Sequence, residues 1–186
     1  MKSHRTPLRF LALLGLVALT ACQSGWDPDD ENAETEKAAM RRDASAATTA
    51  FKSADSTLSR FFNESAGYAV FPNVGKGGLV VGGAHGNGVV YAGGAVDGYS
   101  SLSQVTVGLQ AGGQEYSEIV FFKDETALDD FRRGNFELSA QASAIAAREG
   151  AATAGDYNDG VAIFYLPKGG LMFEASVGGQ KFEYWK

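Results

Sequence analysis

The chain has 186 residues, of which 45% are hydrophobic and 20% charged, and its 22 acidic and 16 basic residues give a formal net charge of −6. This length suffices for one hydrophobic core, and the acidic balance argues against electrostatic attraction to nucleic acid. The single cysteine, Cys22, excludes a disulfide within the chain, so stability must come from the burial of apolar surface.

The first residues have the layout of a secretory signal peptide. Three basic residues precede an apolar run from Phe10 to Leu19, which is shorter than the roughly 20 residues that a transmembrane helix needs. The run leads into Thr20-Ala21-Cys22, a pattern that resembles the bacterial lipoprotein signal. We therefore expect residues 1–21 to be removed and Cys22 to be acylated, for instance with palmitate. The alternative is an ordinary secretion signal that leaves Cys22 as a stray thiol.

The residues after the cysteine indicate a tether and a destination. Gln23 and Ser24 follow Cys22 with no aspartate, which is typical of sorting to the outer membrane, so we expect a lipid-anchored protein of the bacterial cell envelope that faces the periplasm. Residues 23–37 contain six acids and one lysine and cannot bury enough apolar surface to order themselves. This predicts a flexible acidic linker up to residue 37 and a single domain over 38–186.

Helical periodicity begins at about Ala38. Apolar side chains recur at helical spacing up to Asn63, which predicts one long amphipathic helix over 38–63. Basic residues, among them Lys52 and Arg60, lie on one flank of the apolar stripe. Such a flank could lie on a membrane surface; in the simpler interpretation the stripe packs on the domain and the cations are solvated.

A glycine-rich region follows, with fourteen glycines from Gly67 to Gly113 among aliphatic and aromatic residues. This composition predicts short strands that pair antiparallel, separated by tight turns such as residues 85–88. The expected strands are Tyr68–Phe71, Leu79–Ala84, Val89–Val96, Gln104–Gln110 and Glu115–Phe122.

A second, short helix is predicted from Asp124 to Arg133. Asp124 is a suitable N-cap residue and Gly134 a suitable stop. Residues 136–146 fit either a helix or a strand, and 148–159 read as a loop. Three strands are then expected to close the chain: Val161–Leu166, Leu171–Val177 and Lys181–Trp185.

Residues suited to catalysis are scarce. Without residues 1–21 the chain has one histidine, His85, in a glycine-rich stretch read as a turn. Gly75-Lys76 is followed by Gly77, where a phosphate-binding loop needs Ser or Thr. We therefore expect no catalytic residues, metal or cofactor, although a pocket that gathered His85 with a carboxylate and a serine would revive a hydrolase.

Several motifs together carry a resemblance to a known family. They are the segment 65–72 (Ser-Ala-Gly-Tyr-Ala-Val-Phe-Pro), Lys76-Gly77-Gly78, the segment 108–114 and Lys168-Gly169-Gly170-Leu171. In combination they resemble the SYLF domain family over about residues 46–186. The resemblance implies a non-enzymatic lipid-binding module, since eukaryotic relatives bind phosphoinositides and a yeast branch binds and bundles actin.

For an exported lipoprotein, the transferable part of this resemblance is contact with anionic lipid headgroups. We expect cations at helix and turn positions to make that contact, with Lys76 and Lys168 in matching turns. Arg132 and Arg133 have a simpler interpretation, because cations at a helix C-terminus complement the helix dipole. The candidate headgroup-binding residues are Lys76, Arg132, Arg133, Lys168, Arg60 and Lys52.

The sequence thus predicts an α+β domain, in which a long N-terminal helix packs on a curved glycine-rich antiparallel sheet or partial barrel with a short inserted helix. The expected function is a membrane-anchored lipoprotein with a lipid-binding domain. The alternative is a structural or protein-interaction module of the cell envelope with no intrinsic lipid binding.

Overall fold

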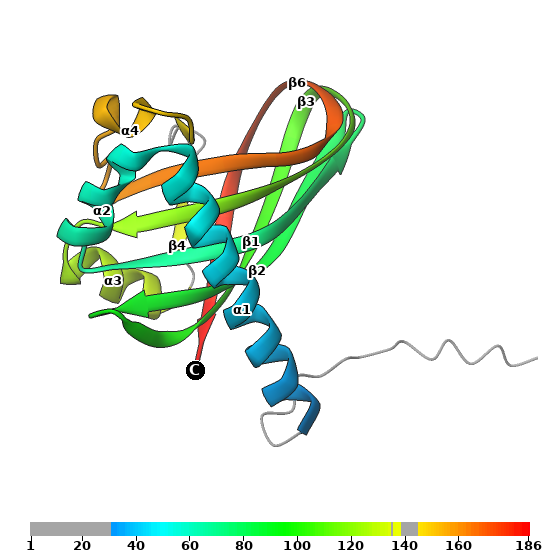
Figure 1. Ribbon diagram of the computed structural model, residues 1–186. Coiled ribbons are helices and arrows are strands. Elements are labelled where there is room, and N and C mark those ends of the chain that lie inside the picture. The colour runs from blue at the N-terminus through cyan, green and yellow to red at the C-terminus, as the bar shows by residue number, and fades with distance from the viewer. Residues whose placement is uncertain (1–30, 135, 139–144) are drawn as a thin grey trace, which may run out of the picture.

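The computed structural model describes residues 31–134, 136–138 and 145–186, so the predicted signal peptide and Cys22 lie outside the described residues. The architecture is α+β, as predicted: a curled sheet carries helices on both of its faces (Figure 1). None of the helices in the described ranges is both long and apolar enough to cross a bilayer.

The N-terminal helical region is interrupted at Asp55 and is not one continuous helix. Helix α1 covers Glu31–Ala54, a 3-10 turn η1 covers Ser56–Leu58, and α2 covers Ser59–Glu64. Asp55 has extended backbone angles and caps η1, because its side chain accepts a hydrogen bond from the Thr57 N–H at 2.9 Å. A capping aspartate starts a new helical segment, which the apolar periodicity alone does not reveal.

Helix α1 also begins earlier than the predicted start at Ala38. The acidic stretch expected to be a linker is helical from Glu31 onward, and Ala33 is already buried. Carboxylates near a helix N-terminus interact favourably with the helix dipole, and Lys37 Nζ pairs with Glu34 Oε1 at 3.1 Å. Local helix electrostatics therefore order residues whose composition suggests a tether.

Four strands form most of the sheet: β1 and β2, which pair as a hairpin, and the longer strands β3 and β6. The bounds are β1 Gly67–Gly78, β2 Val81–Ala92, β3 Ala95–Phe122 and β6 Val161–Trp185. The first part of β3 pairs with β2 and its last part with β1, while β6 pairs with β3 along its whole length. The sheet therefore curls around an interior, without closing into a barrel within the described residues (Figure 1).

The predicted short strands are segments of these longer ones. Residues 85–88, expected to form a turn, lie inside β2, and the three expected C-terminal strands are the single strand β6. The glycines there serve close packing: a Cβ at Gly88 would lie 2.6 Å from Val70 O and 2.7 Å from Phe71 Cδ1. The true β2–β3 turn is Gly93-Gly94, where positive φ values of 57° and 80° suit a type I′ hairpin.

The segment between β3 and β6 contains the predicted short helix. Helix α3 spans Glu125–Arg132, with Asp124 as its N-cap and Gly134 at positive φ just beyond it, which confirms the prediction. Short strands β4 (Phe136–Leu138) and β5 (Ile145–Ala146) pair with β6, followed by α4 (Ala151–Ala154) in the expected loop. Because β5 runs parallel to β6, the sheet is mixed, and the prediction of a wholly antiparallel sheet is wrong at this strand.

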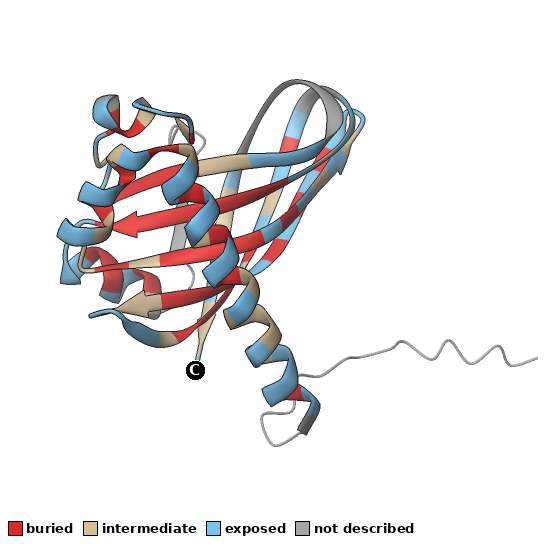
Figure 2. Cartoon of the chain, viewed as in Figure 1, coloured by how far each residue is buried: buried red, intermediate tan, exposed pale blue. Residues whose placement is uncertain are grey.

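The two faces of the sheet bury separate hydrophobic clusters, because side chains alternate between faces along each strand. The interior cluster packs Phe71, Leu102 and Phe182 against Leu128 and Phe131 of α3. The outer cluster lies under α1, α2 and α4, and Figure 2 shows buried positions along the strands beneath these helices. At the far end of the curl, beyond both clusters, the strands become exposed (Figure 2).

Candidate functional site

Of the six cations expected to contact headgroups, Arg132 is the most firmly engaged within the protein. Its Nε and Nη2 atoms donate to the two carboxylate oxygens of Asp97 at 2.8 and 2.9 Å, and Nη1 donates to Asp129 at 2.9 Å. The hydrogen bonds from Arg132 lower the pKa of Asp97 despite its partial burial, and they raise the pKa of Arg132 further. Arg132 therefore fastens α3 to β3 and has its charge compensated.

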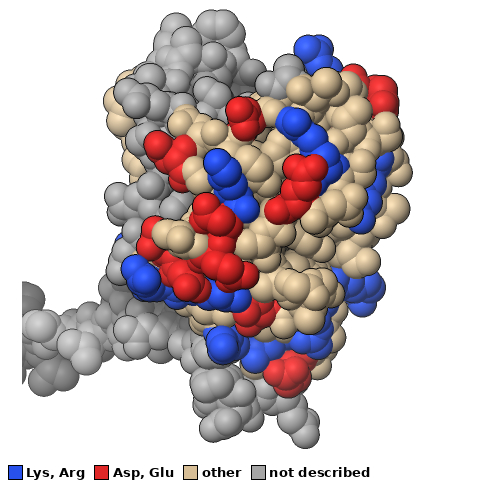
Figure 3. Space-filling model, turned by 90° about the vertical axis from the view of Figure 1, so that its left-hand side faces the viewer, with Lys and Arg blue, Asp and Glu red and all other residues tan. Residues whose placement is uncertain are grey.

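Arg133 lies next to it and also has an acidic partner, since Nη1 is 3.1 Å from Asp130 Oδ1. Figure 3 views the end of the molecule that carries α2, α3 and α4, and there basic and acidic side chains are interspersed. The sequence predicts the cations at this end but not their carboxylate partners, one of which comes from β3. Among the described residues, the charges at this end are mixed and do not make the uniform positive field that would attract an anionic surface.

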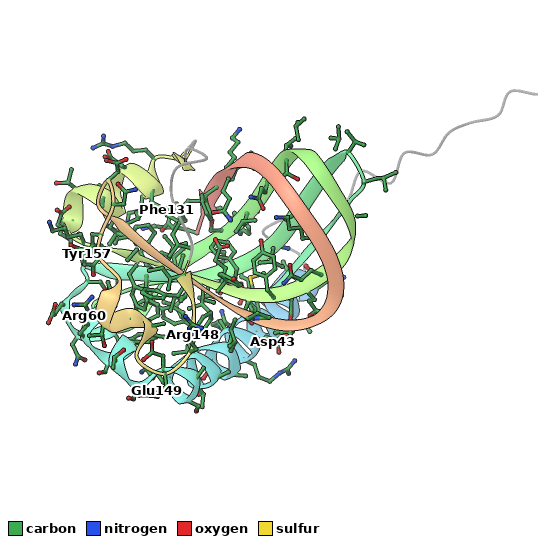
Figure 4. All side chains as sticks on the ribbon, turned by 90° about the horizontal axis from the view of Figure 1, so that it is seen from above. Asp43, Arg60, Phe131, Arg148, Glu149 and Tyr157 are labelled. Carbon is green, nitrogen blue, oxygen red and sulfur yellow. The ribbon has the colours of Figure 1, made fainter. Side chains whose placement is uncertain are left out.

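Arg60 and Lys52 each contact an aromatic ring of α2. The Arg60 guanidinium lies 4.6 Å from the Phe61 ring centroid and donates to the carbonyl oxygens of Ala152, at 2.8 Å, and Gly155. It thereby satisfies the C-terminal end of α4 (Figure 4). Lys52 Nζ lies 4.3 Å from the centroid of a ring on α2. Both cations have a structural role in joining helical segments.

Lys76 and Lys168 lie within strands β1 and β6, where turns were expected. Lys168 is on the outer side, where Nζ donates to Asn73 Oδ1 and lies 3.9 Å from Glu115 Oε1. Lys76 is on the interior side and lines a pocket together with Glu118. The two lysines thus occupy opposite faces of the sheet at a similar level along the strands.

An exposed apolar surface lies at the end of the β1–β2 hairpin. We call it the hairpin tip and define it as Leu79, Val80, Val81, Val105 and Val107. These side chains are between 57% and 68% exposed, and Val81 and Val107 are direct cross-strand partners. In the sequence this surface corresponds to three aliphatic residues, 79–81, between two glycine pairs. The same pattern also fits the beginning of the strand predicted over Leu79–Ala84. A contiguous cluster of exposed aliphatic residues is typical of an interaction surface.

The interior of the curl contains a polar pocket of about 200 Å³. Its walls include the amides of Gln104, Gln114 and Gln180 and the rings of Tyr116 and Tyr165. None of these five residues is predictable as a site residue from the sequence, because their convergence depends on the curling of β3 and β6.

Glu118 is the unusual member of this pocket. Its side chain is buried, Oε2 accepts a hydrogen bond from Gln180 Nε2 at 2.9 Å, and no described residue donates to Oε1. Burial raises the pKa of Glu118 to about 7, opposed by the hydrogen bond from Gln180 and by the charge of Lys76. In the sequence Glu118 directly precedes the apolar run Ile119–Phe122, which is the local signal of its position at a buried part of the strand.

His85, predicted to lie in a turn, lines a pocket together with Glu36 and Asp43, but within the described part of the chain its ring makes no hydrogen bond to a carboxylate. His85 is on an exposed position of β2, with Nδ1 3.4 Å from Ser103 Oγ. Within the described ranges, no group of three or more His, Cys, Asp or Glu side chains is placed to hold a metal ion.

The curled sheet, its exposed tip and its interior pocket define an α+β binding module. Residues 103–184 match the family model described as Las17-binding protein actin regulator (Ysc84). The chain is also 30% identical over 144 residues to Beta cell expansion factor A from Aeromonas veronii. The aligned region covers 71% of this chain and 54% of that relative. The chain therefore spans about half of that relative's length. These matches identify a SYLF-family domain in the chain, and this family consists of non-enzymatic binding domains.

Proposed function

We propose that this protein is a non-enzymatic lipoprotein that is anchored through acylated Cys22 and contacts the bilayer a second time through the hairpin tip. The observation that carries the proposal is the exposure of five aliphatic side chains at one end of the sheet. Burying one such side chain in an apolar environment contributes about 1.5–3 kcal/mol. An anchored domain also meets the membrane at a high effective concentration, so a modest intrinsic affinity suffices.

The positions of Lys76 and Lys168 support a preference for anionic headgroups in this proposal. Lys76 precedes Leu79 by three residues, which at ~3.3 Å per residue places its backbone about 10 Å from the tip. Interfacial segments bury their apolar face by about 5–10 Å, so the two lysines would lie at headgroup depth. The cations of α2 and α3 sit at the other end of the sheet and would lie away from that surface.

Cosedimentation of residues 23–186 with neutral and anionic vesicles, at low and at physiological salt, tests this proposal. The double variant Leu79→Ser/Val81→Ser removes about five apolar carbons, so we expect binding to weaken by at least about 30-fold. Val96→Ser is the matched control, because Val96 is an exposed valine near the opposite β2–β3 turn. Equal binding by the double variant and the control would exclude the tip as the lipid contact.

The lysines are tested separately in the same assay. We expect Lys76→Ala/Lys168→Ala to reduce the preference for anionic vesicles and its salt dependence, and Arg133→Ala to leave both unchanged. If the protein binds to none of the vesicles, the result favours the alternative, a structural or protein-interaction module of the cell envelope. The family description as Las17-binding would then make a protein the occupant of the tip.

Localisation follows from the same proposal. The absence of an aspartate after Cys22 supports sorting of the acylated chain to the periplasmic face of an outer membrane as part of this proposal. Fractionation of cells that express the full chain or Cys22→Ser tests this placement: the unaltered chain should sediment with outer membranes and the variant should not.

A further inference from the structure

The interior pocket has the composition of a binding site, independently of the lipid contact proposed above. Most of a curled sheet's interior is filled by apolar side chains, and here the core under α3 fulfils that role. Next to this core the lining changes to three glutamines, two tyrosines, Lys76 and Glu118. Ligand sites favour such concave positions in the mouths of curled β structures, where a few polar groups converge.

Glu118 indicates that a hydrogen-bond donor is missing from the pocket. Its side chain is 1% exposed, yet Oε1 receives no hydrogen bond from a described residue while Oε2 is held by Gln180. Leaving a buried polar atom unpaired costs about 1–3 kcal/mol, so native structures rarely keep one without a purpose. A ligand hydroxyl donating to Oε1 would remove this cost.

The charge of the lining selects against ionic ligands. Among the described lining residues there is one acid, Glu118, and one base, Lys76, and the charge of Lys76 favours the ionised form of Glu118. When Glu118 is ionised the two charges offset each other, so the described lining has no net charge to attract an ion. The amides of Gln104, Gln114 and Gln180 can each donate and accept hydrogen bonds. This combination matches a molecule that carries several hydroxyl groups and no net charge.

The volume limits the ligand to a single small ring. The pocket holds about 200 Å³. An apolar cavity of about 150 Å³ holds one benzene molecule, so this volume has room for about one compact ring with its substituents. The rings of Tyr116 and Tyr165 stand nearly perpendicular, at 80° with centroids 6.3 Å apart, and offer apolar walls to a ring's carbon atoms.

We propose that this pocket binds an uncharged polyhydroxyl group of the size of one sugar ring, with a hydroxyl donating to Glu118 Oε1. Glucose and the anionic glucuronate, two probes of similar size, test the charge argument when titrated into the full chain by calorimetry at pH 8, where Glu118 is ionised. We expect saturable binding of glucose that exceeds binding of glucuronate by about tenfold or more. Preference for glucuronate overturns the proposal.

Variants locate the site. Glu118→Leu removes the acceptor and should weaken glucose binding by about tenfold to a hundredfold, whereas Glu118→Gln keeps an acceptor oxygen and should stay within about threefold. Glu115→Gln is the matched control, because Glu115 lies on the same strand but next to Lys168 on the outer side. Unaltered binding by Glu118→Leu refutes the assignment.

A measurement on the unaltered protein guards against misfolding of Glu118→Leu. We expect glucose to shift the side-chain amide resonances of Gln104 and Gln180, and shifts confined to other glutamines contradict the proposal. The same chemistry occurs in free sugars and in the headgroups of neutral glycolipids. Binding of free glucose indicates the first source; binding only to vesicles with a glucosyl lipid, lost in Glu118→Leu, indicates the second; failure of both overturns the proposal.

Discussion

Asp55 joins two parts of the chain that are distant in sequence, and its removal should strongly destabilise the fold. The side chain is fully buried. It accepts hydrogen bonds from Thr57 N and Oγ1 at 2.9 and 2.5 Å, and from the backbone N–H groups of Gly150 and Ala152 at 3.1 and 2.7 Å. One carboxylate therefore caps η1 and holds the segment that contains α4.

The expected magnitude follows from these contacts. Loss of an N-cap costs about 1 kcal/mol. The variant Asp55→Ala would also leave the buried Ala152 N–H and the partly buried Gly150 N–H without acceptors, at about 1–3 kcal/mol each. We expect the free energy of unfolding to fall by about 3–5 kcal/mol. Asp43→Ala, at a half-exposed acid of α1, is the control, with a change of about 0.5 kcal/mol or less.

The effect should depend on pH. Burial alone would raise the pKa of Asp55, but the hydrogen bonds from Thr57, Ala152 and Gly150 outweigh it and lower the pKa below 3.8. A carboxylate with a depressed pKa stabilises the folded state above its unfolded-state pKa, and this contribution is lost as the pH falls through the folded-state value. Urea unfolding at pH 7 and at pH 3 measures both effects. A change in Asp55→Ala no larger than in Asp43→Ala at pH 7 would refute the reasoning.

Three further predictions concern the sheet and α3. Burial raises the pKa of Glu118 from 4.5 to about 7, so the folded state binds the proton of this carboxyl group more tightly than the unfolded state does. The free energy of unfolding should therefore decline by about 3 kcal/mol as the pH rises from about 4.5 to 7. Urea titrations of Glu118→Gln should lack this slope. Gly88→Ala should cost about 2–4 kcal/mol in the same assay, because its Cβ would lie 2.6 Å from a carbonyl oxygen of β1, whereas Gly75→Ala, with nothing within 4 Å, should cost little. Arg132→Leu should cost about 1–3 kcal/mol by leaving Asp97 partly buried without its bidentate partner, and Arg132→Lys should restore only part of this in thermal unfolding.

Elements whose signals lie close together in the chain are predictable from the sequence, whereas elements that depend on distant segments are not. Helix α3 was predictable because its signals are adjacent in the chain: Asp124 caps it and Gly134 ends it. The strand boundaries were not predictable in this way. Glycines such as Gly88 are typical of turns, but in this sheet they permit close contact with a neighbouring strand. Close packing of that kind depends on which strands become neighbours, and pairing in β3 extends to both β1 and β2.

The candidate sites show the same division. The cations were identified in the sequence, but the pairing of Arg132 with Asp97 joins residues 35 positions apart. The tip could have been suspected from the aliphatic run at Leu79, yet its exposure depends on the hairpin projecting beyond the helices. Glu118 could not be identified as a pocket residue from the sequence, because its burial results from the curl of the sheet. Acylation of Cys22 stays a prediction from the signal pattern.

Direct measurement of insertion depth at the hairpin tip tests the central claim. Residues 23–186 contain no native cysteine, so Val80→Cys provides a single attachment point for a nitroxide spin label, with Lys123→Cys after β3 as the control position. In the presence of anionic vesicles, we predict that the label at position 80 becomes accessible to oxygen and protected from an aqueous nickel complex, while the label at position 123 stays water-exposed. Equal access of the nickel complex to both labels in vesicle-bound protein would contradict bilayer contact through the tip.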